Sequence, residues 1–380
     1  MTTASFFDRL FKAEGPGVAA DRPPRRAAFS SEARAERSAA FLDAAGWGGA
    51  ARESLAGDAS NRRYERLTHP NGSAAVLMDA PSEKGEDVRP FAALTGHLRE
   101  RGLSAPEILA ADLEDGFLLL EDLGDELYAR VAARAPEDEK LLYQQAVELL
   151  AALHSRPAPA AAQAAGPAPG PGWEATLVLR PYDMAELQRE AMLFLDWWQT
   201  GATGAAATEW ARKSFETALA AMLREIASAR DALVLRDFHA ENLIWLPSRG
   251  RLACVGLLDY QDALIGHPAY DLVSLLEDAR RDVAPELAEE MIALYVARRG
   301  LATMEEDRFR LAYAALGAQR NLKIIGIFAR LWLRDGKERY LAHVPRVWAH
   351  LRRGLAARPE LARMSGWLEA NAAAPTAEAL

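Results

Sequence analysis

The chain has 380 residues, of which 50% are hydrophobic and 26% are charged, and its formal net charge is -9 at pH 7. This composition is ordinary for a globular protein, and the length predicts two domains or lobes. The acidic balance excludes a broad electrostatic surface for nucleic acid or anionic lipid. The single cysteine, Cys254, excludes an intramolecular disulfide framework and a cysteine-rich zinc site.

The N-terminal segment contains GPG and RPPRR, which predict a flexible extension over residues 1–30. It lacks the layout of a signal peptide, and no apolar run in the chain reaches the length of a membrane span. We therefore expect a cytoplasmic protein with no membrane partner and no nucleic-acid partner. We also expect a monomer.

The next part of the chain is rich in strand patterns. The stretches ASNRRYERL, AAVLMDA and GFLLLED predict three strands, and HPNG predicts the turn between the first two. One helix is expected over residues 88–101. Strands, one helix and then helices almost to the end predict an α+β fold, with a small sheet-rich lobe over residues 31–122 and a larger helical lobe over residues 123–380.

Helical patterns dominate the second lobe. EDEKLLYQQAVELLAALH, ending at residue 154, repeats apolar residues along one helical stripe. The following RPAPAAAQAAGPAPGPG, residues 156–172, predicts a linker or surface loop that cannot bury a core. Further helices are expected over residues 183–199 and 209–229.

Two charged segments each place an aspartate directly after an apolar strand: LRDFHAEN, residues 235–242, and GLLDYQD, residues 256–262. This arrangement suits phosphoryl transfer, in which one carboxylate receives the proton of a hydroxyl group. An asparagine oxygen and a second carboxylate then hold Mg²⁺ on the phosphates. Either segment alone could be a turn capped by Asp or Asn. Their occurrence together, in this order, favours a catalytic site.

The string RDFHAEN followed by LLDYQDALIGHPAYDL resembles the aminoglycoside phosphotransferase and choline kinase family, whose two-lobed fold is that of the protein kinases. The resemblance implies that Asp237 is the catalytic base and that Asn242 and Asp259 bind Mg²⁺. Leu235 and Arg236 stand where the family has His and Gly. Asp271 matches a later aspartate of the family, for which we expect hydrogen bonds to loop amides. For His239 we likewise expect a role in ordering the loop.

The segment GFLLLEDLGD resembles the hinge of the same family, where backbone groups meet the adenine of ATP. The resemblance therefore implies adenine contacts at Leu119, Glu121 and Asp122.

The phosphate side departs from the kinase pattern. Kinases carry a strand lysine that contacts the ATP phosphates, but AVLMD has Met78 at that place. GDASNRRY supplies a turn whose amides can cradle phosphate, and an alternating strand can turn only one of its two arginines inward. The expected phosphate contacts are Ser60, Asn61 and Arg62, with Arg63 and Lys84 as alternatives for the missing charge.

The strings GDASNRRYERL, VLMDAP, RPF and QRNLKIIGIFARL narrow the resemblance to bacterial anomeric kinases of N-acetylmuramate and N-acetylglucosamine. This implies an ATP-dependent phosphotransferase that acts on the anomeric hydroxyl of a small amino sugar during cell-wall recycling. Sugar contacts are expected from Trp197, Arg280 and Arg320.

Two alternatives stay open. One is a phosphotransferase for aminoglycosides or other small alcohols, although polycationic acceptors would require an acidic pocket. The other is a non-catalytic nucleotide-binding module.

Overall fold

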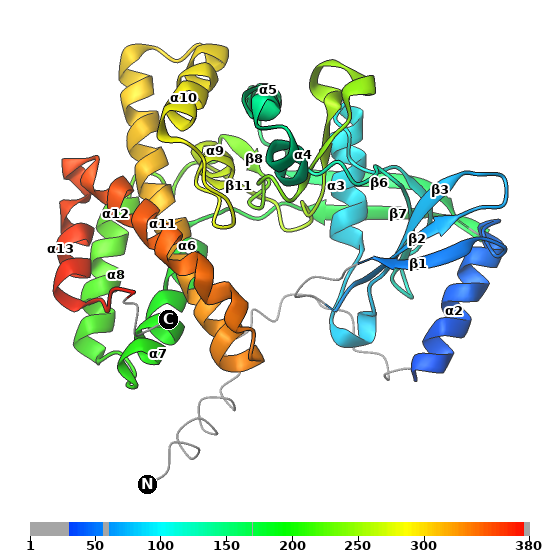
Figure 1. The fold of residues 1–380 in the computed structure, drawn as a ribbon, viewed down its shortest axis with the longest axis horizontal. Coiled ribbons are helices and arrows are strands. Elements are labelled where there is room, and N and C mark those ends of the chain that lie inside the picture. The colour runs from blue at the N-terminus through cyan, green and yellow to red at the C-terminus, as the bar shows by residue number, and fades with distance from the viewer. Residues whose placement is uncertain (1–29, 56–60, 169, 376–380) are drawn as a thin grey trace, which may run out of the picture.

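The computed structural model describes residues 30–55, 61–168 and 170–375. The extension predicted over residues 1–30 lies outside this part except for Ser30, which caps the first described helix. Ser60 and the neighbouring residues of the expected phosphate turn also lie outside it. The described chain forms a sheet-rich lobe and a helical lobe, as the α+β prediction required (Figure 1).

The N-terminal lobe is built on a five-stranded antiparallel sheet of order β1-β2-β3-β5-β4. The strands are β1 (Ala51–Leu55), β2 (Arg63–Thr68), β3 (Ala74–Asp79), β4 (Ile108–Asp112) and β5 (Phe117–Glu121). The three predicted strands correspond to β2, β3 and β5. The predicted turn joins β2 to β3, with Gly72 at φ 89°. The sequence did not indicate β1 or β4.

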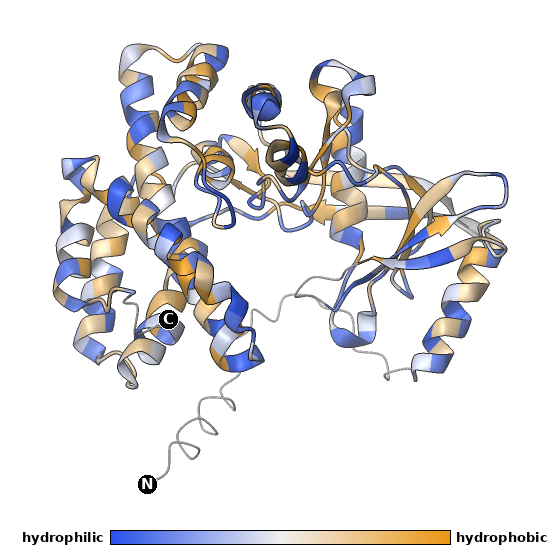
Figure 2. Cartoon of the chain, viewed as in Figure 1, coloured by the Kyte–Doolittle hydropathy of each residue, from blue (hydrophilic) through white to orange (hydrophobic). Residues whose placement is uncertain are grey.

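Two helices cover the two faces of this sheet, α2 (Ser31–Ala44) and α3 (Arg89–Glu100). Alternate residues of β3 explain this arrangement, since successive strand side chains point to opposite faces. Leu77 packs with α2 in a small cluster, whereas Met78 joins the larger core that includes α3. Strand β3 is therefore largely apolar, while the edge strand β1 carries polar residues (Figure 2).

The C-terminal lobe consists mainly of helices around one apolar core. They are α4 (Tyr128–Arg134), α5 (Glu139–His154), α6 (Met184–Ala191), α7 (Thr200–Thr203), α8 (Glu209–Leu223), α9 (Ala269–Leu276), α10 (Pro285–Arg299), α11 (Thr303–Asp335), α12 (Val344–Ala356) and α13 (Ala362–Asn371). The helix predicted over residues 183–199 is divided, because a π-helical segment, η3 (Phe194–Gln199), follows α6. In the described part of the chain, no helix has the length and apolar character needed to cross a membrane.

The Pro/Ala/Gly-rich segment is not the linker expected over residues 156–172. It forms an antiparallel hairpin, β6 (Ala161–Ala168) and β7 (Gly170–Val178), which packs on α3 and β4. Small residues permit this close approach, since a Cβ added at Gly96 of α3 would lie 2.5 Å from the Cβ of Ala164. Trp173 supplies buried apolar area. The hairpin thus adds to the N-terminal lobe, and the boundary expected at residue 122 does not separate the two lobes cleanly.

Two short antiparallel pairs in the C-terminal lobe frame the charged segments. Strand β8 (Ala232–Val234) pairs with β11 (Leu264–Gly266), and β9 (Leu243–Trp245) pairs with β10 (Val255–Leu257). We call residues 235–242, between β8 and β9, the Asp237 loop. Residues 258–263, between β10 and β11, are the Asp259 loop. Both loops therefore start and end on strands of the same small framework.

Candidate active site

The start of the Asp237 loop is fixed by a buried carboxylate. Asp271 of α9 is fully buried, and its two oxygens accept hydrogen bonds from the backbone N–H groups of Leu235 and Arg236, each at 2.7 Å. The Nε2 atom of His154, at the end of α5, lies 3.4 Å from Asp271 Oδ2. The contact that the sequence suggested between Asp271 and the loop amides is therefore present.

Arg236 adopts a backbone conformation that residues other than glycine rarely adopt. Its φ is 71°, in the left-handed region, at the position where the resembling family has glycine. Its guanidinium forms an ion pair with Glu190 of α6 and donates a 3.1 Å hydrogen bond to the carbonyl of Asp262. These side-chain contacts hold a strained residue in place next to Asp237 and also link the two loops.

A buried group of charges lies behind Asp237. Glu190 also forms an ion pair with Lys323 of α11, whose Nζ lies 3.0 Å from Glu190 Oε1. Burial alone would raise the pKa of Glu190, but Lys323 and Arg236 outweigh it and lower that pKa to about 2. The same two cations act on Asp237: they overcome the opposing effect of burial and hold its pKa below the ordinary value. Asp237 is consequently ionised near neutral pH.

Asn242 connects the end of the Asp237 loop to its centre. Its Nδ2 donates to the carbonyl of Asp237 at 2.9 Å. This bond leaves the amide oxygen as the side-chain atom that can bind a cation. In addition, the N–H of Leu258 donates to the carbonyl of Asn242 at 2.9 Å. The structure therefore brings the Asp237 and Asp259 loops side by side.

Asp259 is the second strained residue of the site, with φ 56°. One of its oxygens, Oδ1, accepts a 2.7 Å hydrogen bond from Gln261. Burial and the negative charge of Asp237 raise the pKa of Asp259. A carboxylate whose charge is destabilised in this way, on a loop that is hydrogen-bonded to the backbone of Asn242, suits a hard cation. Asp259 and Asn242 thus fit Mg²⁺, which takes few ligands from the protein and the rest from phosphate and water.

His239 is buried and lies against the asparagine. Its Nε2 is 3.3 Å from Asn242 Nδ2 and 3.5 Å from a terminal nitrogen of Arg280. Both neighbours are N–H donors, so Nε2 accepts and the ring proton is on Nδ1. Burial lowers the pKa of His239 to about 4, so the ring is neutral near pH 7. These contacts are those of a group that orders the loop.

The N-terminal lobe contributes a cation on the side of the Asp259 loop. Met78 is 1% exposed and belongs to the core, so the strand position of the usual kinase lysine is closed to a nucleotide. Arg62 instead forms a 2.9 Å ion pair with Glu86, and both side chains are mostly buried. Burial opposes the charge on Arg62, yet surrounding groups that include Glu86 and Asp259 raise the pKa of its guanidinium. Of the two neighbouring arginines, Arg62 is therefore the one with a mostly buried side chain, and Arg63 is exposed.

The expected hinge needs one correction. Leu119 lies in the middle of β5, paired with Leu77 of β3 and Ala110 of β4, and its side chain is buried in the cluster beneath α2. It is not available to adenine. The N–H of Glu121 is also engaged, by the carbonyl of Glu107 at 2.8 Å.

Asp122 follows the end of β5. Its carboxylate accepts hydrogen bonds from Arg66 at 2.7 Å and from the N–H of Gly124 at 2.9 Å. An adenine contact at this place is consequently left to the backbone of Asp122 and the residues after it. It stays a prediction.

The three residues expected to contact the sugar lie in different environments. Arg280 lies next to His239, with 29% of its side chain exposed. Arg320 of α11 is buried and donates to Ser274 at 2.8 Å, so it supports α9 and is not open to a substrate. Trp197 lies on η3, half-buried against the main core, and its stacking on a sugar stays a prediction.

Sequence reasoning gave no role to two charged residues that the structure brings to the site, Glu86 and Glu190. Each is far along the chain from the group that it contacts, and neither stands in a motif that implies its partner. Lys323 lies in RNLK, which the sequence suggested as a basic group for an acidic or neutral sugar, but it is buried and paired with Glu190.

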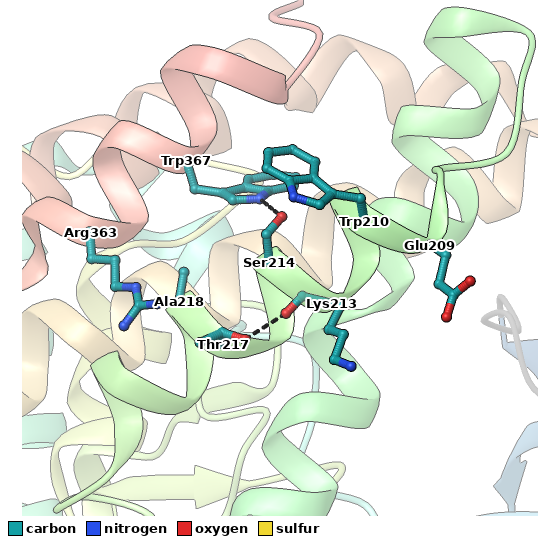
Figure 3. Close-up of a pocket in the computed structure, with 8 residues that line it drawn as sticks. All are labelled: Glu209, Trp210, Lys213, Ser214, Thr217, Ala218, Arg363 and Trp367. Carbon is teal, nitrogen blue, oxygen red and sulfur yellow. Dashed lines mark hydrogen bonds between the residues drawn. The ribbon is translucent and has the colours of Figure 1, made fainter.

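A separate groove of about 730 Å³ lies on α8 and α13, lined by residues that include Trp210 and Trp367 (Figure 3). Trp367 donates to Ser214 at 2.8 Å, and Trp210 is 69% exposed. None of the lining residues belongs to the Asp237 or Asp259 loop. The groove is therefore distinct from the candidate active site.

The site combines an ionised aspartate, an amide and carboxylate pair for a hard cation, and an arginine from a sheet-rich lobe. This set defines a kinase-like phosphotransferase. The family model described as "Phosphotransferase enzyme family" matches residues 52–310. The chain belongs to this family.

Two related proteins are similar in sequence to this chain over most of its length. An N-acetylmuramate/N-acetylglucosamine kinase of Caulobacter vibrioides is 40% identical over 373 residues, which cover 90% of this chain and 97% of the relative. A kinase of the same name from Pseudomonas aeruginosa is 35% identical over 352 residues, or 88% of this chain and 96% of the relative. These relatives are kinases, and the chain is accordingly a phosphotransferase with a small-molecule substrate.

Solved structures share the fold. The ternary complex of streptomycin, ATP and the aminoglycoside phosphotransferase APH(2")-IIa aligns with a TM-score of 0.53 and 14% identity, and the alignment covers 84% of this chain and 97% of that one. An ADP-bound aminoglycoside phosphotransferase, APH(2'')-Ib, gives a TM-score of 0.53, with 85% and 98% covered. The protein-kinase-like fold expected from the sequence is confirmed.

Proposed function

We propose that the protein transfers the γ-phosphoryl group of ATP to the anomeric hydroxyl of N-acetylmuramate or N-acetylglucosamine. The observation that carries the chemistry is the joining of the two loops, with Asn242 bonded to the Asp237 carbonyl and Leu258 bonded to Asn242. The amino-sugar acceptor is supported by the names of the relatives, which match most of the chain. Action in the cytoplasm during cell-wall recycling, and as a monomer, stays a prediction.

In this proposal, Asp237 aligns the anomeric hydroxyl and receives its proton. An anomeric hydroxyl is more acidic than an ordinary alcohol, so a carboxylate is a sufficient base. Asn242 and Asp259 would hold Mg²⁺, which when bound neutralises charge on the phosphates. Arg62 would contact the phosphates from the N-terminal lobe. Its pair with Glu86 fixes the guanidinium on that side.

The test is an acceptor panel with MgATP: N-acetylmuramate, N-acetylglucosamine, kanamycin and choline. We expect phosphorylation of the two amino sugars, and none of their methyl glycosides, in which the anomeric hydroxyl is blocked. Asp237→Asn should lower kcat by orders of magnitude while ATP affinity stays within a few-fold, because removal of the base acts on the transition state. Phosphorylation of the methyl glycosides would refute the anomeric position. Near-normal turnover by Asp237→Asn would refute the role of Asp237.

A further inference from the structure

We propose that Arg280 is a specificity-determining residue that binds a carboxylate on the acceptor sugar. It would thereby favour N-acetylmuramate, whose lactyl group carries a carboxylate, over N-acetylglucosamine, which has none. The inference rests on the proposed function and assigns the discrimination between its two substrates to one side chain.

Other cations close to the Asp237 loop already have buried partners. Within the described part of the chain, Arg236 and Lys323 share the buried carboxylate of Glu190. Arg320 is buried and donates to Ser274. A buried cation with such partners cannot turn to a ligand without leaving an uncompensated carboxylate or hydroxyl behind. Among these cations of the helical lobe, Arg280 is the one open to an anionic acceptor, with 29% of its side chain exposed.

The contacts of Arg280 are long and partly open to solvent. Its Nε lies 3.5 Å from an oxygen of Glu241, and a terminal nitrogen lies 3.5 Å from His239 Nε2. A guanidinium that binds a carboxylate well does so through two parallel bonds of about 2.7–2.9 Å. The side chain of Glu241 is 47% exposed, so water competes with this pair. Arg280 can therefore exchange Glu241 for a better carboxylate.

The shape of the sugar places such a carboxylate near the loop. The lactyl group of N-acetylmuramate is attached at the third ring carbon, and the anomeric carbon is the first. When the anomeric hydroxyl lies against Asp237, a carboxylate on the same ring stays within reach of side chains that flank the loop. Arg280 is such a side chain, since it contacts His239 and Glu241 of that loop.

The start of the Arg280 side chain is fixed, because Asp278 Oδ1 accepts its backbone N–H at 2.8 Å. N-acetylmuramate and N-acetylglucosamine share the acetamido group and most ring hydroxyls, and they differ in the lactyl carboxylate. The charge of Arg280 is therefore the feature that can tell the two sugars apart.

The experiment compares kcat/KM for the two sugars at saturating MgATP. In Arg280→Ala, the loss for N-acetylmuramate should exceed the loss for N-acetylglucosamine by about tenfold or more, which is the size of a lost charge-assisted hydrogen bond. The difference should be in KM. Arg280→Lys keeps the charge but not the paired donors, so its selectivity should lie between those of Ala and the parent. Glu241→Gln removes the competing carboxylate and should shift selectivity toward N-acetylmuramate.

Arg281→Ala is the matched control. The adjacent arginine donates to Tyr143 at 2.6 Å and pairs with Glu139 at 2.6 Å, so the selectivity ratio should not change in this variant. Equal losses for both sugars in Arg280→Ala would overturn the inference, since Arg280 would then act on the phosphates or on the loop. If the parent phosphorylates only another class of acceptor, the proposed function itself fails, and the acceptor panel shows this independently.

Discussion

Arg62→Ala should impair use of ATP, because we propose that this guanidinium takes the place of the strand lysine, where this chain has Met78. A charge-assisted hydrogen bond contributes about 1.5–3 kcal/mol, which corresponds to roughly a tenfold to hundredfold loss in kcat/KM for ATP. Arg62 pairs with Glu86 at 2.9 Å, and the two side chains are only 15% and 14% exposed. Solvent screening of this charge is correspondingly weak.

The assay is steady-state phosphorylation of N-acetylglucosamine with ATP varied, together with direct titration of nucleotide. Arg62→Lys should recover part of the activity because it keeps the charge. Two matched controls are available in the same region, Arg63→Ala and Lys84→Ala, since both side chains are exposed. They should behave like the parent.

The reasoning is refuted if Arg62→Ala and Arg63→Ala have the same kcat/KM for ATP within about twofold. In that case backbone amides and Mg²⁺ would carry the phosphates without an arginine. A parallel measurement of thermal unfolding is needed, because loss of Arg62 leaves the carboxylate of Glu86 without its partner. A lowered kcat/KM in a variant that is fully folded at the assay temperature would support the assignment.

Three further predictions concern the two loops and the charges behind them. Asp259→Ala should abolish the Mg²⁺ dependence of nucleotide binding, and titration with and without Mg²⁺ tests this; unchanged dependence would make Asp259 structural. Asp271→Asn should lower the free energy of unfolding by about 1–3 kcal/mol, because one loop N–H then faces an amide donor, and urea denaturation measures it. Lys323→Met should lower kcat more than it raises the KM for ATP, because Lys323 acts on Asp237 and not on the nucleotide, while Arg310→Met on the surface of the same helix is the control. An ATP KM raised as much as kcat is lowered would contradict this view of Lys323.

The local patterns of the chain predicted most of the elements that carry the site. The strands around Asp237 are short and apolar, and charged residues interrupt them at a fixed spacing, so the loop could be recognised without a structure. The three central strands of the N-terminal sheet were equally clear. Strand β1, ARESL, is largely exposed and polar, so its sequence carries no apolar alternation to read.

The hairpin of β6 and β7 could not be predicted for a different reason. Strand β6, AAQAAGPA, consists mainly of Ala and Gly, which are poor strand formers and give no periodic pattern, and β7 begins with GPG. They are stabilised by tertiary contact, since the small residues allow the backbone to approach Gly96 of α3. Packing outweighs propensity here, and propensity is all that a single sequence displays.

The roles of buried charges were also beyond the sequence. Arg320 and Arg280 are both arginines near the predicted substrate region, and only the fold shows that one is enclosed and the other is open. The adenine contact expected at Leu119 was wrong for a similar reason, because a hinge motif does not reveal where the strand before it ends. The pairing of Glu190 with Lys323 joins residues on α6 and α11, and no local pattern encodes such a contact.

The two strained residues explain why these distant charges matter. Of the three non-glycine residues with positive φ in the described chain, two are Arg236 and Asp259, on either side of the joined loops. Each such conformation costs about 1–3 kcal/mol and persists only where the surroundings over-determine it. For Arg236 the surroundings are Asp271 on its N–H and Glu190 on its guanidinium. Because Glu190 is held in turn by Lys323, the orientation and the charge of Asp237 depend on the same buried group in the helical lobe, while the proposed phosphate contact, Arg62, belongs to the other lobe.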